Sequence, residues 1–134
     1  MKTAKIVYEG GLRTKAVHLR SSREILTDAP PDNNGKGDAF SPTDLLCTSL
    51  GCCMVTIMGI LAEKKGIDIT GTGIEVTKIM GTEPRRVTGI EVEFTMPSKH
   101  YSEKEKQMLE HAARTCPVAY SLHPDIKQEI RFHW

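Results

Sequence analysis

Two cysteines of this chain, Cys53 and Cys116, occupy positions where a thiol is suited to redox chemistry. Cys53 lies deep inside a long uncharged segment, and Cys116 directly precedes Pro117. A thiolate is a strong nucleophile, and a second thiol brought close by folding can resolve the oxidised product of the first. The pair therefore predicts a redox enzyme whose two thiols are far apart in sequence.

The composition is consistent with a small intracellular enzyme. The chain has 134 residues, which predicts a single domain over residues 1–134. A net charge of +1 argues against binding to nucleic acid or to an anionic membrane surface. No apolar leader begins the chain, so we expect a cytoplasmic protein whose four cysteines rest as thiols. Any disulfide there would be transient and catalytic or redox-sensing.

A long helix is predicted to carry Cys53. Ser41 is a suitable N-cap, Pro42 suits the first helical position, and Gly66 suits the end, so the helix should run from Pro42 to about Lys65. Residues 45–62 contain no charge and would span about 27 Å, which is close to the length of a membrane span. Interspersed Thr, Ser and Gly residues favour instead the buried centre of a protein, here of an oligomer.

The remaining segments alternate between apolar and polar residues, which is typical of half-buried strands, and a second helix is predicted among them. Strands are predicted at 5–8, 14–19, 23–27, 73–79, 86–96 and 126–132, with a surface loop from Asp28 to Phe40. A capping box at Ser102–Glu105 begins the second helix, which Pro117 interrupts. These elements predict an α+β protein.

The two reactive thiols need different explanations. The dipole of a helix acts mainly on its first turn, so Cys53 needs a cation, and we expect an arginine to reach it. Cys116 has two readings: an N-cap-like position before Pro117, where N–H groups stabilise a thiolate, or a small apolar residue that completes the helix stripe. Cys47 and Cys52 are expected to pack in the core. On a helix they point about 120° and about 100° away from Cys53, so all three cannot share one site.

Taken together, these motifs resemble the OsmC/Ohr family of thiol-dependent peroxidases. The resemblance rests on Ser41-Pro42-Thr43-Asp44-Leu45-Leu46, Leu50-Gly51-Cys52-Cys53 and Thr115-Cys116-Pro117-Val118, and it extends to the order of the strands. It implies two antiparallel sheets flanking central long helices, in an intertwined homodimer with both sites at the subunit interface. It also implies that Cys53 is the peroxidatic thiol and Cys116 the resolving thiol.

The resemblance further implies an activating arginine from the early glycine-rich turn. Arg13 is the nearest match, and Arg20 and Arg23 are alternatives. Where well-characterised Ohr proteins carry a glutamate that pairs with this arginine, this chain has Thr43. Asp44 is adjacent, but nine helical positions from Cys53 turn it roughly 180° away, so it fits better as a helix-start residue.

These observations predict a peroxidase that reduces organic hydroperoxides through a Cys53 sulfenic acid and a Cys53–Cys116 disulfide, which an external dithiol then reduces. No cofactor is expected. The alternative is an OsmC-like redox-sensing or small-molecule-binding dimer without efficient turnover. A metal site is disfavoured, because the scattered histidines show no ligand spacing typical of zinc.

Overall fold

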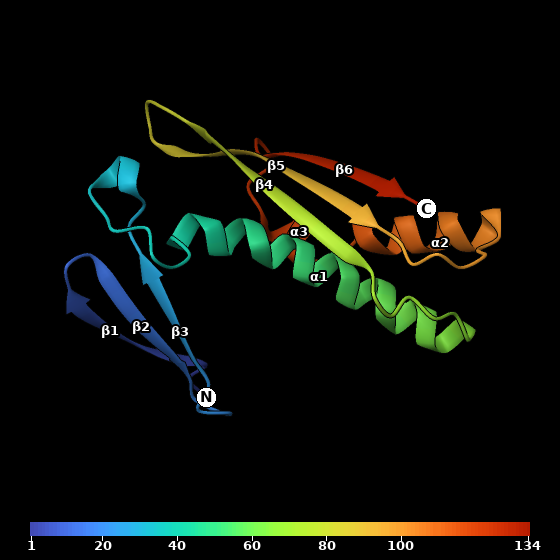
Figure 1. Cartoon of the computed structure of the whole chain (residues 1–134), viewed down its shortest axis with the longest axis horizontal. Helices are drawn as coiled ribbons and strands as arrows, with labels where there is room; N and C mark the ends of the chain where they lie inside the picture. Colours follow the sequence, from blue (N-terminus) through green and yellow to red (C-terminus); the bar gives the residue numbers. More distant parts are fainter. The chain divides into compact units, whose positions relative to one another are not determined.

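The computed structural model describes all residues of the chain, 1–134, and divides them into two compact units. The N-terminal unit comprises Met1–Leu46 and the C-terminal unit Cys47–Trp134. Figure 1 shows the helices and strands of both units. Each unit is described by itself below, so the single domain over residues 1–134 stays a prediction.

The N-terminal unit is a three-stranded antiparallel sheet followed by a loop. Its strands β1 (Ala4–Gly10), β2 (Arg13–His18) and β3 (Glu24–Asp28) pair in sequence order. The turn between β1 and β2 uses positive φ angles at Gly10 and Gly11, which glycine adopts without steric cost. The predicted hairpin and third strand are confirmed. The 3-10 helix η1 (Pro31–Asn33) lies within the predicted surface loop.

The helix α1 (Pro42–Lys65) begins and ends where the sequence predicts. The Ser41 hydroxyl accepts a hydrogen bond from the amide of Asp44 at 3.0 Å, and the Asp44 carboxylate accepts one from the amide of Ser41 at 2.9 Å. This reciprocal cap satisfies amides that a helix start leaves without partners. Asp44 therefore acts as a helix-start residue, as expected. At the other end, Gly66 adopts a left-handed φ of 68°.

The C-terminal unit packs its helices on a second three-stranded sheet. The strands β4 (Gly73–Gly81), β5 (Arg86–Thr95) and β6 (Lys127–His133) lie in that order (Figure 1). The helices α2 (Glu103–Arg114) and α3 (Pro117–Ser121) connect β5 to β6. The pair β4–β5 is antiparallel, but β6 runs parallel to β5, so the second sheet is mixed and not wholly antiparallel as predicted. A crossover through two helices returns the chain to the same end of the sheet, which gives parallel pairing.

The core of the C-terminal unit lies between this sheet and the helices. Ile90, Val92 and Phe94 alternate along β5 and are almost completely buried. Fully buried residues of α1 and α2 belong to the same cluster, among them Leu50, Met54, Met58, Leu109 and Ala113. The α+β fold class is thereby confirmed, with two three-stranded sheets and long helices.

The middle of α1 comes close to the sheet at Gly51. A side chain added there would meet Val76 Cγ2 at 3.1 Å and Ile74 Cγ2 at 3.4 Å, which is tight for a Cβ contact. Glycine therefore lets the helix approach β4 closely, and this contact fixes which face of α1 is turned toward the sheet.

By length and composition, α1 is also the one helix able to cross a membrane. Its face formed by Leu50, Met54 and Met58 is nevertheless packed within the core of the C-terminal unit. That packing favours the interpretation of α1 as a core helix, which explains its lack of charge.

Candidate active site

The fold brings the two predicted redox thiols together in the C-terminal unit. Cys53 lies in the middle of α1, and Cys116 lies between α2 and α3. The two thiols are neighbours: Cys53 packs against the core cluster that contains Cys116, and its proximity contributes to the raised pKa of the Cys116 thiol. Both are free cysteines in this structure. Two neighbouring thiols can be joined by an S–S bond where their Cα atoms lie within about 7 Å of each other.

Cys116 is held at the N-terminus of the short helix α3. Its backbone is extended, with φ −76° and ψ 153°, and Pro117 occupies the first helical position. The Cys116 Sγ accepts a hydrogen bond from the amide of Ala119 at 3.4 Å. The N-cap reading of the sequence is thus confirmed. Cys116 is also fully buried, so the packing reading holds as well.

Burial governs the protonation of Cys116. The apolar surroundings raise the pKa of the Cys116 thiol above its usual range, and this effect outweighs the opposing hydrogen bond from the Ala119 amide. Contact with Cys53 raises the Cys116 pKa further. Cys116 therefore keeps its proton at neutral pH. A protonated, buried thiol suits a partner that reacts second.

Cys53 is the more accessible member of the pair. Its side chain is half-buried, whereas Cys116 is 0% exposed. Ile57 lies one helical turn beyond Cys53 on the same side of α1, and both pack against the edge of the core. Val118 and Ala119 of α3 also pack against that core. A reagent from solvent therefore meets Cys53 first, beside apolar side chains.

The other two cysteines differ from each other. Cys47 is 1% exposed and belongs to the core cluster, as predicted. The prediction that Cys52 packs in the core is wrong, because Cys52 is exposed. One residue along a helix turns the side chain by about 100°, and this rotation carries Cys52 away from the face that contacts the sheet. Neither Cys47 nor Cys52 is part of the Cys53–Cys116 pair.

Arg13 belongs to the N-terminal unit, where its partner is Asp28. The two residues lie opposite each other in the β2–β3 register. Arg13 Nε donates to Asp28 Oδ1 and Arg13 Nη2 donates to Asp28 Oδ2, both at 2.7 Å. This two-point pairing holds the pKa of the Asp28 carboxyl below its usual range and raises the pKa of Arg13.

The alternative arginines have a different setting. Arg20 lies in the turn after β2 and Arg23 directly before β3, and both side chains are exposed. Arg13 is only partly exposed, at 33% of its side chain. Its fixed orientation distinguishes it from the other two candidates.

Asp28 is the residue of functional interest that the sequence did not single out. It is 2% exposed, although it stands at the start of a segment predicted to be a surface loop. The feature that identifies Asp28 is the β2–β3 pairing, which places it directly opposite Arg13. The sequence alone does not give that register.

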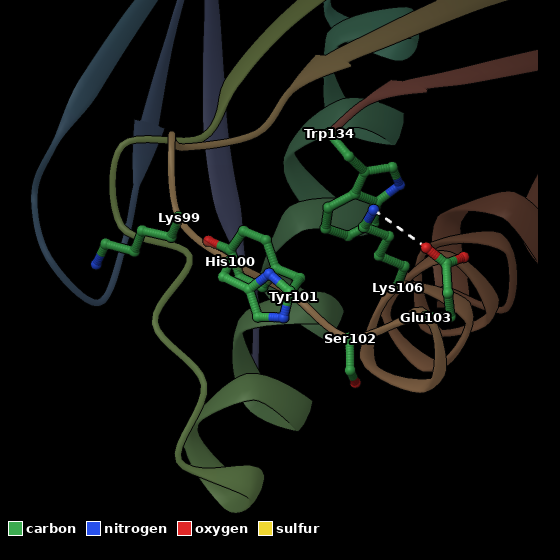
Figure 2. A pocket seen from close by; sticks show the side chains of 7 residues that line it. All are labelled: Lys99, His100, Tyr101, Ser102, Glu103, Lys106 and Trp134. Carbon is green, nitrogen blue, oxygen red and sulfur yellow. Dashed lines mark hydrogen bonds and ion pairs between the residues drawn. The ribbon is translucent and has the colours of Figure 1, made fainter.

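A pocket of about 430 Å³ lies in the C-terminal unit beside the start of α2. Figure 2 shows its lining side chains, including two lysines and the indole of Trp134. Both lysines already have acidic partners: Lys99 pairs with Asp68, and Lys106 with Glu103. No cysteine lines this pocket, so it is separate from the Cys53–Cys116 pair.

Comparison with known proteins identifies the class. The model of the OsmC-like protein family matches residues 35–131. No curated protein sequence matches the chain. A candidate osmotic stress induced and detoxification response protein from Psychrobacter arcticus is 53% identical, with a TM-score of 0.96 over 99% of this chain and 96% of that chain.

Two more distant structures share the fold. The organic hydroperoxide resistance protein OsmC of Legionella pneumophila is 14% identical, with a TM-score of 0.77 over 100% of this chain and 98% of that chain. An organic hydroperoxide resistance protein from Elizabethkingia anophelis is 15% identical, with a TM-score of 0.74 over 98% and 96% of the two chains. The fold with its paired thiols thus defines an OsmC/Ohr-type protein. This chain belongs to the OsmC-like family.

Proposed function

We propose that this protein is a thiol-dependent peroxidase that reduces organic hydroperoxides. The observation that carries the proposal is the proximity of the half-buried Cys53 to the buried Cys116 in one packed cluster. Family membership supports it, because fold relatives include proteins described as organic hydroperoxide resistance proteins. Cys53 is assigned as the peroxidatic thiol and Cys116 as the resolving thiol.

The first step oxidises Cys53. Its thiolate attacks one oxygen of the peroxide, the O–O bond breaks, and the departing alkoxide takes up a proton to leave as an alcohol. The sulfur keeps the other oxygen as a sulfenic acid. Apolar neighbours such as Ile57 favour the organic part of the substrate over hydrogen peroxide, since they can bury it from water.

The second step joins the two sulfurs. The Cys116 sulfur attacks the sulfenic sulfur of Cys53, and the sulfenic oxygen leaves as water with the Cys116 proton. Because burial keeps Cys116 protonated, its hydrogen is available for the departing oxygen. An external dithiol then reduces the disulfide by thiol exchange and becomes a disulfide itself.

Arg13 is assigned as the cation that assists Cys53. A thiolate in the middle of a helix gains little from the helix dipole, so a guanidinium is needed to stabilise it and to orient the peroxide. Arg13 supports this assignment because its side chain is held in one orientation. Arg20 and Arg23 are exposed and are not held in one orientation in this way.

The proposal is tested with the reduced wild-type protein and an organic hydroperoxide such as tert-butyl hydroperoxide. One equivalent should convert Cys53 and Cys116 into a disulfide, identified by peptide mass spectrometry without reductant. With excess dithiol, hydroperoxide consumption should continue over many turnovers. A disulfide without sustained consumption, for several dithiols including a lipoyl dithiol, would instead support the redox-sensing function.

We also propose that the protein works as a homodimer in the cytoplasm. The N-terminal unit supports this, because its buried residues are only Thr27, Asp28 and Ser41, which are all polar. Large apolar side chains of its strands are exposed, among them Ile6 at 66% and Tyr8 at 63%. Apolar surface of this kind usually contacts a partner, and a second copy of the chain is the partner that the family resemblance implies.

The dimer predicts a sedimentation mass of twice 14.9 kDa at micromolar concentration. Ile6→Asp should weaken association at least about tenfold, because it places a charge on the apolar strand face. The matched control is Lys104→Asp, which changes an exposed position of α2 and should leave the mass unchanged. A wild-type protein that stays monomeric would contradict the assembly but leave the thiol chemistry standing.

A further inference from the structure

The turn that carries Cys116 is connected to the sheet by two hydrogen bonds in series. The Cys116 Sγ accepts a hydrogen bond from the amide of Ala119 at 3.4 Å. The carbonyl of the same Ala119 accepts a hydrogen bond from the side-chain amide of Gln128, Nε2, at 3.1 Å. One residue of α3 therefore bonds the buried thiol through its amide and strand β6 through its carbonyl.

The bond from Gln128 replaces one that α3 cannot make for itself. The carbonyls of residues 116–118 each accept a hydrogen bond from a donor four residues further along the chain. The C-cap of α3 is Leu122, so this pattern stops before the carbonyl of Ala119. The end of a helix leaves its last carbonyls without partners inside the helix. Gln128 supplies the partner from outside and so ties the short α3 to the sheet.

Gln128 is a polar residue on a face of β6 that is otherwise apolar. It lies opposite Ile90 of β5, which is fully buried, and directly paired residues of adjacent strands project on the same face. The next residues on that face, Ile130 and Phe132, pack against the core cluster. An amide among such neighbours costs free energy unless it is hydrogen-bonded. The bond to the Ala119 carbonyl offsets this cost.

The orientation of α3 matters for the step that joins the two sulfurs. Cys116 is the N-cap of α3, so a change in the tilt of this helix would move the Cys116 sulfur. That sulfur must reach the sulfur of Cys53 from the side opposite the departing oxygen, and a small misplacement of reacting atoms lowers a rate strongly. Whatever fixes α3 against the sheet therefore influences the formation of the disulfide.

We propose that Gln128 is the positioning residue of the resolving thiol: through the carbonyl of Ala119 it holds α3 so that the Cys116 sulfur faces Cys53. This inference rests on the proposed peroxidase function. The hydrogen bond of Gln128 is made to Ala119 and not to either sulfur, so Gln128 acts through Cys116. It sets how fast the disulfide forms and leaves the reaction of Cys53 with peroxide unchanged.

The test replaces Gln128 with methionine, which keeps the length of the side chain and removes its donor. With one equivalent of tert-butyl hydroperoxide, rapid mixing should show peroxide consumed at a rate within about twofold of wild type. Disulfide formation should be about tenfold slower. With excess peroxide, sulfinic acid at Cys53 should accumulate about tenfold more, because the sulfenic acid persists for longer. Gln107→Met is the matched control: it makes the same change at an exposed position of α2 and should leave both rates unchanged.

A second measurement reports on the Cys116 sulfur without any peroxide. The ultraviolet absorbance of the Cys116 thiolate is followed against pH in the Cys53→Ser protein, with the Cys53→Ser, Cys116→Ser double variant as the blank. The hydrogen bond from the Ala119 amide lowers the pKa of Cys116 against the effect of burial. Adding Gln128→Met should weaken that bond and move the titration to higher pH. A Gln128 that only supports the fold would leave the titration unchanged.

Gln128→Glu keeps nearly the same shape and guards against a methionine variant that fails to fold. Its ionised carboxylate cannot donate to the Ala119 carbonyl, so disulfide formation should slow at least as much. In the Cys116→Ser background, adding Gln128→Met should change turnover by less than about twofold, since the effect passes through Cys116.

Wild-type disulfide rates in either folded variant, or an equal slowing of both steps, would overturn the inference. A further loss in the Cys116→Ser background would overturn it as well. If the wild-type protein itself consumes no hydroperoxide, the proposed function fails instead, and the thiolate titration still tests whether Gln128 positions Cys116.

Discussion

Cys53→Ser should reduce hydroperoxide consumption to the uncatalysed background, a loss of at least about 10³-fold in kcat. A serine hydroxyl stays protonated and is a poor nucleophile toward the O–O bond, so the first step does not occur. The measurement is steady-state loss of tert-butyl hydroperoxide with excess dithiol. No sulfenic acid should be trapped by dimedone at position 53.

Cys52→Ser is the matched control for this experiment. Cys52 is the neighbouring residue, but it is exposed and lies on a different face of α1. This control should keep wild-type turnover. Full activity in Cys53→Ser, or its loss in Cys52→Ser alone, would place the nucleophile elsewhere and refute the assignment.

Cys116→Ser should separate the first turnover from all later ones. Cys53 can still attack the peroxide, so one equivalent of hydroperoxide should be consumed at a rate within about tenfold of wild type. Without the buried partner thiol, the sulfenic acid persists, and excess peroxide oxidises it to sulfinic acid. Steady-state turnover should therefore fall by at least about 10²-fold. Rapid-mixing kinetics and intact-protein mass spectrometry measure the two effects.

The serine at position 116 is a fair probe of chemistry, because it should not disturb the fold. Serine is a favoured N-cap residue, so it can replace the Cys116 Sγ as acceptor for the Ala119 amide. Thermal unfolding checks this expectation. Undiminished multiple turnover in Cys116→Ser would show that an external thiol, and not Cys116, resolves the sulfenic acid.

Much of the fold was predictable because its signals are local. Ser41, Pro42 and Gly66 mark the ends of α1, and the structure places them there. The pairing of Cys53 with Cys116 was inferred from the setting of each thiol, and the family resemblance implied their separate roles, since no local pattern relates positions so far apart. The two thiols are neighbours in the structure.

Three features escaped sequence reasoning for physical reasons. The helix α1 is apolar on all sides, so composition does not reveal which face packs, and Cys52 was placed in the core when it is exposed. The alternation of apolar and polar residues identified β6 but not its direction, because side chains repeat every two residues in parallel and antiparallel strands alike. The pairing of Asp28 with Arg13 depends on strand register, and a loop brings the Asp38 amide to the same carboxylate.

The N-terminal sheet has no apolar interior of its own, and this determines which property of the protein a substitution there would change. Substitutions of the apolar residues of β1 remove little packing within the unit, because every residue of β1 is exposed in the single chain. In the proposed assembly, their cost appears as a change in association, so the apparent melting temperature would vary with dilution. In that proposed assembly, variation in β1 would be constrained by the fit to a partner surface more than by the filling of a core.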